Sequence, residues 1–580
     1  MNIKPIVLAV SLLLCISAFA QHNEEVTIEG IYRPKVNKVD KIVLRPEIPE
    51  QKFEMPAAKT HLMEVDRRFP LEFEKLDAQY YNGKNARMPE STKNFLLVGM
   101  GSRISPVFLY KHNSKLTKNL GLGVGIKHYS SWLDIKDYAP SSFMNNAFEI
   151  GLTSSKYKGV QLGGNVYYKN DLYHYYGVNL KDHPLTPVEM GNYCGGVTYH
   201  TLGAHFGLVS TSTRVGEFSH KASADYRFFM GCVQTTDFIG CEHTAELDYG
   251  LSYTENWWGD RNYPQKLGLD MGVEYAYDVL NSLESRMAVT FNPFFEMKGD
   301  FYRLRLGMKA DWMNVDPKFT VAPDLDGSLF VLNHKLEFYA GLNGGWRLLT
   351  LQELVTENPF LAMGKMGLFL PTQMGQLFPT HVKLGFDGGL RTNIAEVVDL
   401  HLGVRYRHTD NDPLYVCDFL DTYPSDPIYN TFSLVYDETQ RVSVLADMRL
   451  KLRSGFTADL GFAYNHYDLS KYQYAWHRPT TEGSAKLTYE FNEKLSLNTS
   501  FLYQGGRYAA FVPAFGVPPQ VTGAKKLKDV FDLGLGADYR VNDQLSVFAK
   551  LDNVANQKYQ LYYDYPVTGI QFFAGLKMQF

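Results

Sequence analysis

The sequence predicts an all-β protein, a large antiparallel transmembrane β-barrel of about 22 strands preceded by a short irregular periplasmic or lumenal segment. Three observations predict this fold class. The chain begins with an export signal, apolar and polar residues alternate with a period of two from Phe95 onward, and the last twelve residues read as one such strand ending in an aromatic residue.

Residues 1–20 have the features of a signal peptide. Lys4 precedes an apolar run from Ile6 to Ile16, and a small-residue site follows, so we expect cleavage between Ala20 and Gln21. Cys15 allows a lipoprotein alternative, but Leu14 stands before it where a small residue is normally required. Export through the inner membrane agrees with a barrel in the outer membrane of a Gram-negative bacterium.

The composition narrows the class of protein further. No run of 18 apolar residues occurs outside the N-terminus, which excludes helical membrane spans. Aromatic residues make up 14% of the chain, which suits the interfacial girdles of a barrel. The formal net charge of -4 gives no indication of a nucleic-acid partner.

Residues 21–94 differ from the rest of the chain. They hold six prolines and short apolar pieces between charges, without sustained alternation. We interpret 21–94 as a periplasmic or lumenal segment and 95–580 as the barrel domain.

The strand pattern is clear in Asn119–Tyr129, Arg441–Leu452 and Phe531–Tyr539. In the second of these, the apolar residues that begin with Val442 face away from the charged residues that begin with Arg441. Charges on the inner face of strand after strand would destabilise a packed core, whereas they are ordinary in a polar lumen.

The connections alternate in length, as they do in outer-membrane barrels. Short turns are predicted at Lys298-Gly299, Arg453-Ser454, Asn492-Glu493 and Val541–Asp543. Long outer connections are predicted at about 170–194, 350–379, 410–430, 507–528 and 554–568. About 21 segments can be counted, but termini on one side require an even number, so either Phe95–Tyr110 holds two strands or another segment is misread.

The final strand carries its apolar residues on one face. They are Ile570, Phe572, Leu576, Met578 and Phe580. We expect this strand to act in barrel assembly, with outer-membrane lipid and the assembly machinery as partners.

The region from Leu545 to Phe580 resembles the end of TonB-dependent receptors. The matching positions are Asp552, Asn553, Val554, Asn556, Lys558, Tyr559, Pro566, Gly569 and Phe580. The resemblance extends fairly over 330–580 and loosely over 95–330. It implies a role in passing or binding a polar solute.

The N-terminal segment departs from that family. Residues 21–94 carry none of the plug domain's glycine-rich motifs and are too few for it, whereas Glu24, Glu25, Val26, Thr27 and Ile28 are similar to the stretch that pairs with TonB. Residues 26–49 and Gly125–Trp132 resemble a plug-lacking group of TonB-dependent receptor-like barrels from Bacteroidetes-type bacteria.

No motif for catalysis, a cofactor or a metal site occurs, so we expect no enzyme and no cofactor. Asp324–Gly327 and Asp410–Asp412 could hold calcium in outer loops, but their composition is equally that of simple turns. Cys232 and Cys241 flank a short loop and are either a disulfide or two free thiols.

Aromatic residues near the outer loops are the candidates for ligand contact, because flat rings stack on sugars and grip apolar solutes. The three candidate trios are Tyr173, Tyr175 and Tyr176; Tyr472, Tyr474 and Trp476; and Tyr562, Tyr563 and Tyr565. The alternative is that they form the upper girdle.

The sequence therefore predicts an outer-membrane receptor or transport barrel, coupled to TonB or to another periplasmic protein. The alternative is a structural or assembly barrel with 21–94 as a docking arm.

Overall fold

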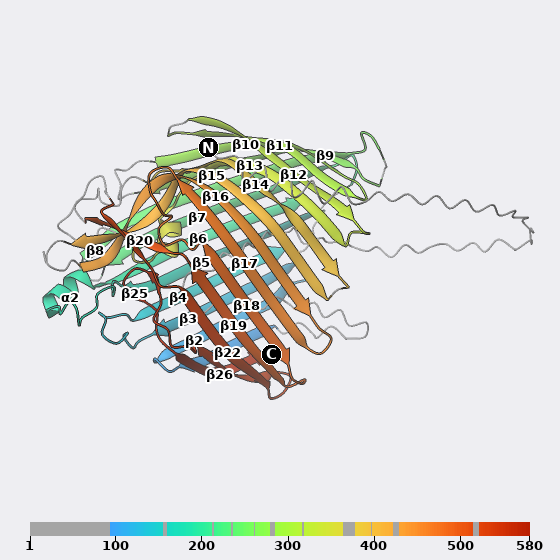
Figure 1. Cartoon of the computed structure of the whole chain (residues 1–580). Coiled ribbons are helices and arrows are strands. Elements are labelled where there is room, and N and C mark those ends of the chain that lie inside the picture. Colours follow the sequence, from blue (N-terminus) through green and yellow to red (C-terminus); the bar gives the residue numbers. More distant parts are fainter. Residues whose placement is uncertain are drawn as a thin grey trace, which may run out of the picture. The chain divides into compact units, whose positions relative to one another are not determined.

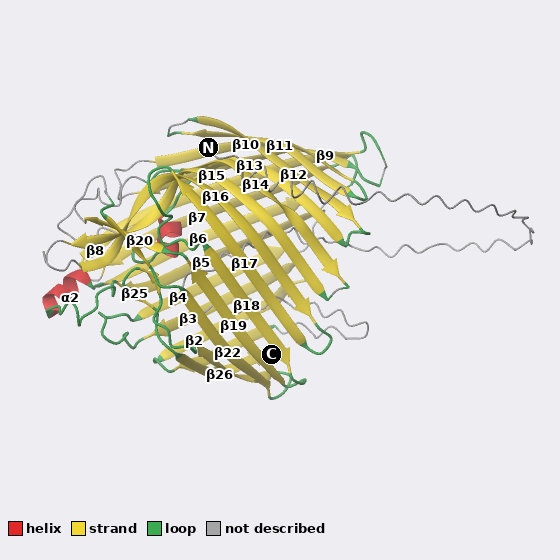
Figure 2. Ribbon diagram, viewed as in Figure 1, coloured by secondary structure: helices red, strands yellow, loops and turns green. Residues whose placement is uncertain are grey.

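The computed structural model describes residues 93–154, 159–210, 214–233, 236–259, 262–278, 285–315, 318–362, 377–395, 397–420, 428–513 and 521–580. These residues form a closed antiparallel β-barrel of 22 strands, as the sequence predicts (Figure 1, Figure 2). Within the described ranges, no helix has the length and hydropathy that a membrane span requires.

The first half of the barrel follows chain order. Its strands are β1 (Asn94–Gly101), β2 (Ser105–Thr117), β3 (Leu120–Ser131), β4 (Phe143–Ser154), β5 (Val160–His174), β6 (Gly196–Ser210), β7 (Phe218–Val233), β8 (Thr236–Glu255), β9 (Gln265–Asp278), β10 (Ser285–Lys298) and β11 (Tyr302–Met313).

The second half continues with β12 (Phe319–Val331), β13 (Leu336–Arg347), β14 (Thr380–Ile394), β15 (Val398–Leu420), β16 (Ile428–Lys451), β17 (Phe456–Leu469), β18 (Thr481–Glu490), β19 (Leu495–Gly505), β22 (Val530–Arg540), β23 (Leu545–Asp552) and β26 (Gln571–Gln579). The connections hold the short elements β20 (Tyr508–Pro513), β21 (Gly523–Lys526), β24 (Gln560–Tyr562), β25 (Tyr565–Pro566), α2 (Pro187–Tyr193) and α3 (Leu351–Glu357).

The last strand closes the barrel against the first. β26 pairs with β1 in an antiparallel register that joins Phe95 to Gln579 and Gly101 to Phe573. Asn94 and Phe580 extend the seam by exchanging backbone hydrogen bonds of 2.8 and 3.0 Å. A closed barrel leaves no open strand edge, which is required in lipid because no water is there to satisfy backbone groups.

The two faces of each strand differ as predicted. On β26 the Phe572 side chain is 47% exposed on the outside, whereas the adjacent Phe573 is 3% exposed on the inside. The same outward exposure of large apolar residues recurs around the barrel, for example at Phe148, Leu247, Leu306, Val404, Val444, Phe462 and Leu535. This apolar outer surface faces lipid.

The structure resolves the strand count. Phe95–Tyr110 contains most of β1 and the beginning of β2, joined by a tight turn at 102–104. The predicted short turns at 298–299, 453–454, 492–493 and 541–543 also lie at or beside strand ends.

The prediction of a loop over 410–430 was wrong. β15 and β16 continue to pair inside the range of the predicted loop, as far as Leu420 and Ile428. The turn-like Asp410–Pro413 forms a bulge in that ladder, where Asn411 has a φ of 51° that asparagine tolerates. Asp324–Gly327, also expected in an outer loop, lies inside β12.

Gly575 is required at the closing seam. A Cβ atom on Gly575 would lie 2.6 Å from the Cα of Gly99 and 2.7 Å from the ring of Phe548. By contrast, a Cβ on Gly121 in β3 would find its nearest neighbour, the backbone oxygen of Thr153, at 3.6 Å.

We therefore expect Gly575→Ala to lower the free energy of unfolding by about 1–3 kcal/mol, the usual cost of overpacking. Urea titration of the refolded barrel measures this difference. Gly121→Ala is the matched control, and equal stability of the two variants would contradict a tight seam.

Candidate functional site

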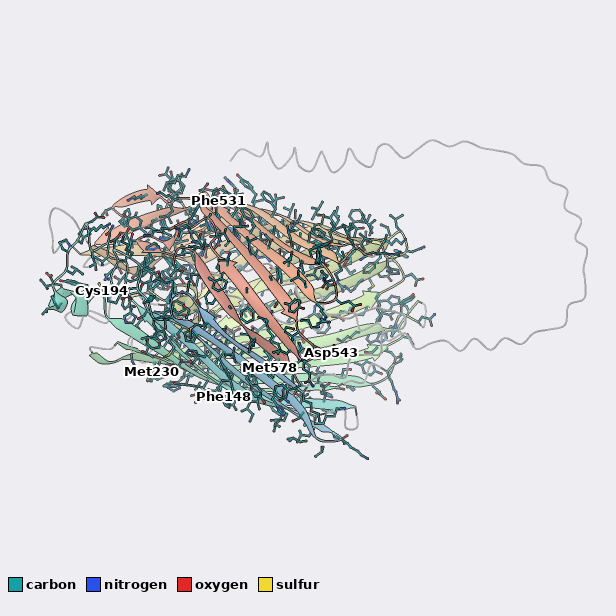
Figure 3. The ribbon with its side chains drawn as sticks, turned by 90° about the horizontal axis from the view of Figure 1, so that it is seen from below. Phe148, Cys194, Met230, Phe531, Asp543 and Met578 are labelled. Atoms are coloured by element: carbon teal, nitrogen blue, oxygen red, sulfur yellow. The ribbon has the colours of Figure 1, made fainter. Side chains whose placement is uncertain are left out.

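The long connections gather at one end of the barrel, and Asn94 and Phe580 meet at the other end. Figure 3 shows Cys194 at this end and Asp543, from a short turn, toward the other. Buried side chains from five of these connections and strand extensions pack into one apolar cluster. We call the following residues the lid: Tyr175, Tyr176, Tyr199, Leu354, Phe360, Leu361, Tyr415, Phe432, Tyr562 and Tyr565.

The rings of the lid pack against one another. Phe360 and Tyr565 stack with ring centroids 3.7 Å apart, and Tyr176 meets both rings edge-on at 5.6 and 4.8 Å. Such aromatic pairs contribute about 0.5–1.5 kcal/mol each beyond the area they bury. Segments that are distant in sequence are thereby held in one cluster.

Tyrosine hydroxyls hold the backbone of the lid. Four hydroxyl groups donate to carbonyl oxygens of the segment 354–361: Tyr415 to Leu354 (3.1 Å), Tyr562 to Glu357 (2.7 Å), Tyr199 to Pro359 (3.0 Å) and Tyr175 to Leu361 (2.9 Å). Two more donate to neighbouring loops, Tyr176 to Pro566 (3.1 Å) and Tyr565 to Asn430 (2.6 Å). Buried carbonyl groups outside regular structure need such donors.

Helix α3 carries the lid segment inward and is anchored to the wall. Its N-cap is Thr350, which exchanges hydrogen bonds with Glu353 in a capping box. The Glu242 carboxylate of β8 accepts a hydrogen bond of 2.9 Å from the backbone N–H of Leu351, and its other oxygen accepts one of 3.0 Å from Arg286 of β10. Arg286 also donates to the carbonyl of Leu349.

The Glu242–Arg286 pair is deeply buried, with side-chain exposures of 0% and 7%. A carboxylate at a helix N-terminus is favoured by the helix dipole. Removal of one partner from a buried pair typically costs about 3–5 kcal/mol, because the other charge stays buried. The lid is therefore fixed both by its own rings and by the barrel wall.

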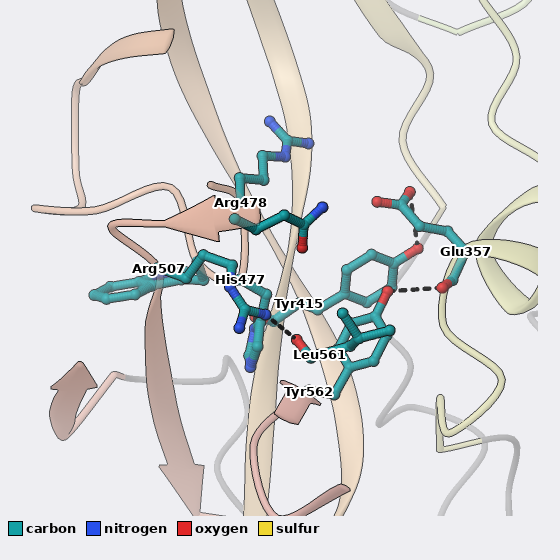
Figure 4. A pocket seen from close by; sticks show the side chains of 9 residues that line it. Glu357, Tyr415, His477, Arg478, Arg507, Leu561 and Tyr562 are labelled. Atoms are coloured by element: carbon teal, nitrogen blue, oxygen red, sulfur yellow. Dashed lines mark hydrogen bonds between the residues drawn. The ribbon is translucent and has the colours of Figure 1, made fainter. Parts of the chain in front are cut away.

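A small cavity lies within the lid, beside α3 (Figure 4). Its volume is about 10 Å³, room for roughly one water molecule. Figure 4 shows the side chains of Tyr415, His477 and Arg507 in its lining. In this conformation the cavity has no space for a solute.

Below the lid the lumen wall is charged. Arg305 donates to three carboxylates, those of Asp270 (2.9 Å), Glu296 (2.7 Å) and Asp324 (3.1 Å). Three strands further along, Asp387 of β14 accepts from Arg405 and Arg407, each at 2.6 Å. The inner face predicted from strand alternation is therefore a polar surface under an aromatic lid.

The three aromatic trios lie in two clusters. Tyr173, Tyr175 and Tyr176 belong to the large cluster that contains the lid, where Tyr175 is 0% exposed. Tyr562 and Tyr565 are buried in the same large cluster, and Tyr563 packs against it. Tyr472, Tyr474 and Trp476 pack in a second cluster, in which Tyr474 stacks on Tyr508 at 3.8 Å. In this conformation their rings pack on protein, and ligand contact by any of the three trios stays a prediction.

Cys232, Cys241 and Cys417 are free thiols. The disulfide considered for Cys232 and Cys241 is not formed, because the register pairs Cys241 with Met230 and places Cys232 two residues further along. Asp410 and Asp412 are in ion pairs with Lys383 and Arg478, and the described residues contain no group of three or more side chains suited to a metal.

The N-terminal predictions lie outside the described residues. These are the cleavage site at Ala20 and Gln21 and the TonB-like stretch Glu24–Ile28. They stay predictions.

Sequence reasoning missed Glu242, Arg286 and helix α3. The pattern Thr350-x-x-Glu353 is a capping-box signal that could have located the helix. No local signal marks Glu242, which lies 109 residues from its partner Leu351.

No protein-family model and no curated protein matches the sequence. Several solved structures share the fold. The siderophore receptor PirA from Acinetobacter baumannii matches with a TM-score of 0.61 at 10% identity, covering 86% of this chain and 81% of that one.

Two further structures match similarly. The pyoverdine outer membrane receptor FpvA from Pseudomonas aeruginosa PAO1 has a TM-score of 0.60 at 12% identity, with coverage of 86% and 80%. The ferric-catecholate import receptor Fiu from E. coli K12 has a TM-score of 0.57 at 10% identity, with coverage of 85% and 82%.

These identities establish the likeness at the level of the fold. They confirm the fold that the C-terminal resemblance implies, a large closed β-barrel such as siderophore receptors have. The chain is an outer-membrane β-barrel with the fold of siderophore receptors.

Proposed function

We propose that this protein is an outer-membrane receptor or transport barrel that binds or passes a polar solute and is gated at its outer end by the lid. The observation that carries the proposal is a closed barrel whose lumen wall is charged beneath an apolar lid. Similar solved structures are named as receptors or as an import receptor, which supports the same class.

The lid has the construction of a gate. Its parts come from several connections and are joined by hydroxyl-to-carbonyl bonds, each worth about 0.5–1.5 kcal/mol net. Bonds of that size can be exchanged one at a time when a solute binds. In the proposed cycle, TonB pairs with Glu24–Ile28 and the segment 21–92 takes part in opening the lumen.

One carboxyl beside the lid, held by the chain neighbours of Phe432, makes the gate sensitive to pH. Asp418 lies on the part of β15 above the rim and accepts hydrogen bonds from Ser433 (2.6 Å) and Thr431 (3.1 Å). Burial outweighs these donors and raises the pKa of Asp418 to about 6. Burial also raises the pKa of the neighbouring loop residue Asp564, to about 6.

The first prediction concerns the N-terminal segment. A form lacking 22–92 keeps Asn94 and therefore the β1–β26 seam. In planar bilayers we expect larger or more frequent conductance steps from this form than from the mature protein. Equal conductance of the two forms would show that residues 22–92 take no part in gating.

The second prediction concerns the lid hydroxyls. Replacing Tyr175, Tyr199, Tyr415 and Tyr562 by Phe removes the hydroxyl donors from four carbonyl groups, so we expect the open state to be populated about tenfold more often or higher. Single-channel recording measures this population.

The control replaces four tyrosines on the lipid-facing side by Phe. They are Tyr168, Tyr226, Tyr249 and Tyr406, whose hydroxyls contact side chains on the same face. If neither the lid variant nor the form lacking 22–92 conducts, transport is ruled out and a closed barrel with 21–94 as a docking arm takes its place.

The third prediction concerns pH. An unfolded aspartate has a pKa near 3.9, so the folded lid binds the Asp418 proton more tightly. The contribution to lid stability is complete below about pH 4 and is lost as the pH rises through about 6.

We therefore expect faster hydrogen exchange, corrected for intrinsic rates, in peptides from 351–362 at pH 7.5 than at pH 5. Asp418→Asn keeps the hydrogen-bonding shape without titrating and should reduce the difference, with Asp564 supplying the remainder. An unchanged difference in Asp418→Asn would assign the pH effect to other groups.

A further inference from the structure

Two arginines stand side by side on the lumen wall below the lid. The β15–β16 register places Arg407 directly opposite Arg441. Their chain neighbour Val442 is 40% exposed on the lipid side, so alternation directs both arginines inward. Like charges directly opposite one another in a sheet destabilise it unless an anion compensates them.

The wall supplies too little negative charge for this group. Asp387 of β14 serves two arginines at once, Arg405 through Nε and Arg407 through Nη2. The other guanidinium nitrogen of Arg407, Nη1, donates to the backbone oxygens of Phe386 (3.3 Å) and Tyr406 (3.0 Å). One carboxylate therefore faces two cations before Arg441 is considered.

Arg441 itself interacts with the Tyr467 side chain of β17. Among the ion pairs of the described residues, none includes Arg441. The next charges along the wall, Asp412 and Arg478, neutralise each other through a two-point contact. Both of these charges also act on Arg441. The group formed by Arg405, Arg407, Arg441 and Arg478 with Asp387 and Asp412 thus carries four positive charges against two negative charges.

Other arginines of the same wall have carboxylates of their own. Arg391 lies 3.5 Å from Glu337, Arg303 lies 3.6 Å from Asp326, and Arg449 pairs with Asp459. Arg449 is on the same strand and the same face as Arg441, eight residues nearer the opposite end. The lack of a carboxylate in ion-pair contact with Arg441 is therefore a local feature of the wall beneath the lid.

The guanidinium group is planar and presents parallel N–H donors that match the oxygens of a carboxylate or a phosphate. A low local dielectric strengthens such contacts relative to water. An oxyanion placed between Arg407 and Arg441 would remove the like-charge repulsion and supply the missing acceptor.

We propose that Arg407 and Arg441 form an oxyanion-binding patch for a carboxylate or phosphate group of the solute. This inference rests on the proposed function and narrows the polar solute to an anionic one. The patch lies within the lumen, so a solute reaches it once the lid has opened or from below.

The test is equilibrium binding of two probes, citrate and inorganic phosphate, to the purified mature chain in detergent by titration calorimetry. Arg441→Gln should weaken the binding of at least one probe about tenfold or more, because it removes a charge-assisted contact. A larger effect on citrate identifies a carboxylate site, and a larger effect on phosphate identifies a phosphate site.

Arg449→Gln is the matched control, since it removes the same charge from the same strand and face but leaves a paired site. It should leave the affinity within about twofold of the parent. Arg441→Lys keeps the charge and loses the planar fork, so an intermediate affinity is expected.

Binding that Arg441→Gln abolishes supports the proposal, whether it is seen in the mature chain or only in the form lacking 22–92. Absence of binding in both forms overturns it, as does equal weakening by Arg441→Gln and Arg449→Gln. Conductance without probe binding would contradict the oxyanion-binding patch but not the proposed transport. Probe binding without conductance would contradict the proposed transport but not the patch.

Discussion

The width of the barrel is the constraint on which the rest of the structure depends. Twenty-two strands enclose an interior that wall side chains alone do not fill, unlike the interior of an eight-stranded barrel. Backbone pairing around the closed ring fixes that width, since every strand must satisfy its groups on its neighbours. Something other than the wall must therefore close the lumen, and at the outer end the chain's own connections do so.

The lid meets this requirement with groups that are unusual in a barrel wall. The end of helix α3 and the segment after it carry buried carbonyl groups, and four tyrosines donate hydrogen bonds to them. Tyrosine suits this position because its ring fills space while its hydroxyl reaches a partner. The Glu242–Arg286 pair adds a fixed point at the start of α3.

The sequence predicts those parts of the fold that depend on local patterns. Alternation from Phe95 onward and the short turns locate the barrel, because a period of two in side-chain direction is a property of each strand by itself. Asp410–Pro413 shows where such reasoning fails, since its composition fits both a turn and a bulge, and continued pairing of β15 with β16 decides between them. The lid could not be predicted, because Glu242 meets Leu351 across 109 residues and Tyr562 meets Glu357 across 205.

Pairing of charges separates structural arginines from candidate functional ones. An arginine such as Arg305, held by three carboxylates and stacked 3.7 Å from the ring of Phe294, has its donors satisfied and its position fixed. Its removal would chiefly disturb the wall. Arg441 differs because its nearest charged neighbour across the strand has the same sign, so the folded wall keeps a repulsion that a carboxylate at that site would relieve. Water in the lumen screens this repulsion in part. An anion that binds between the two arginines removes the repulsion that is left, and this gain in free energy favours its binding.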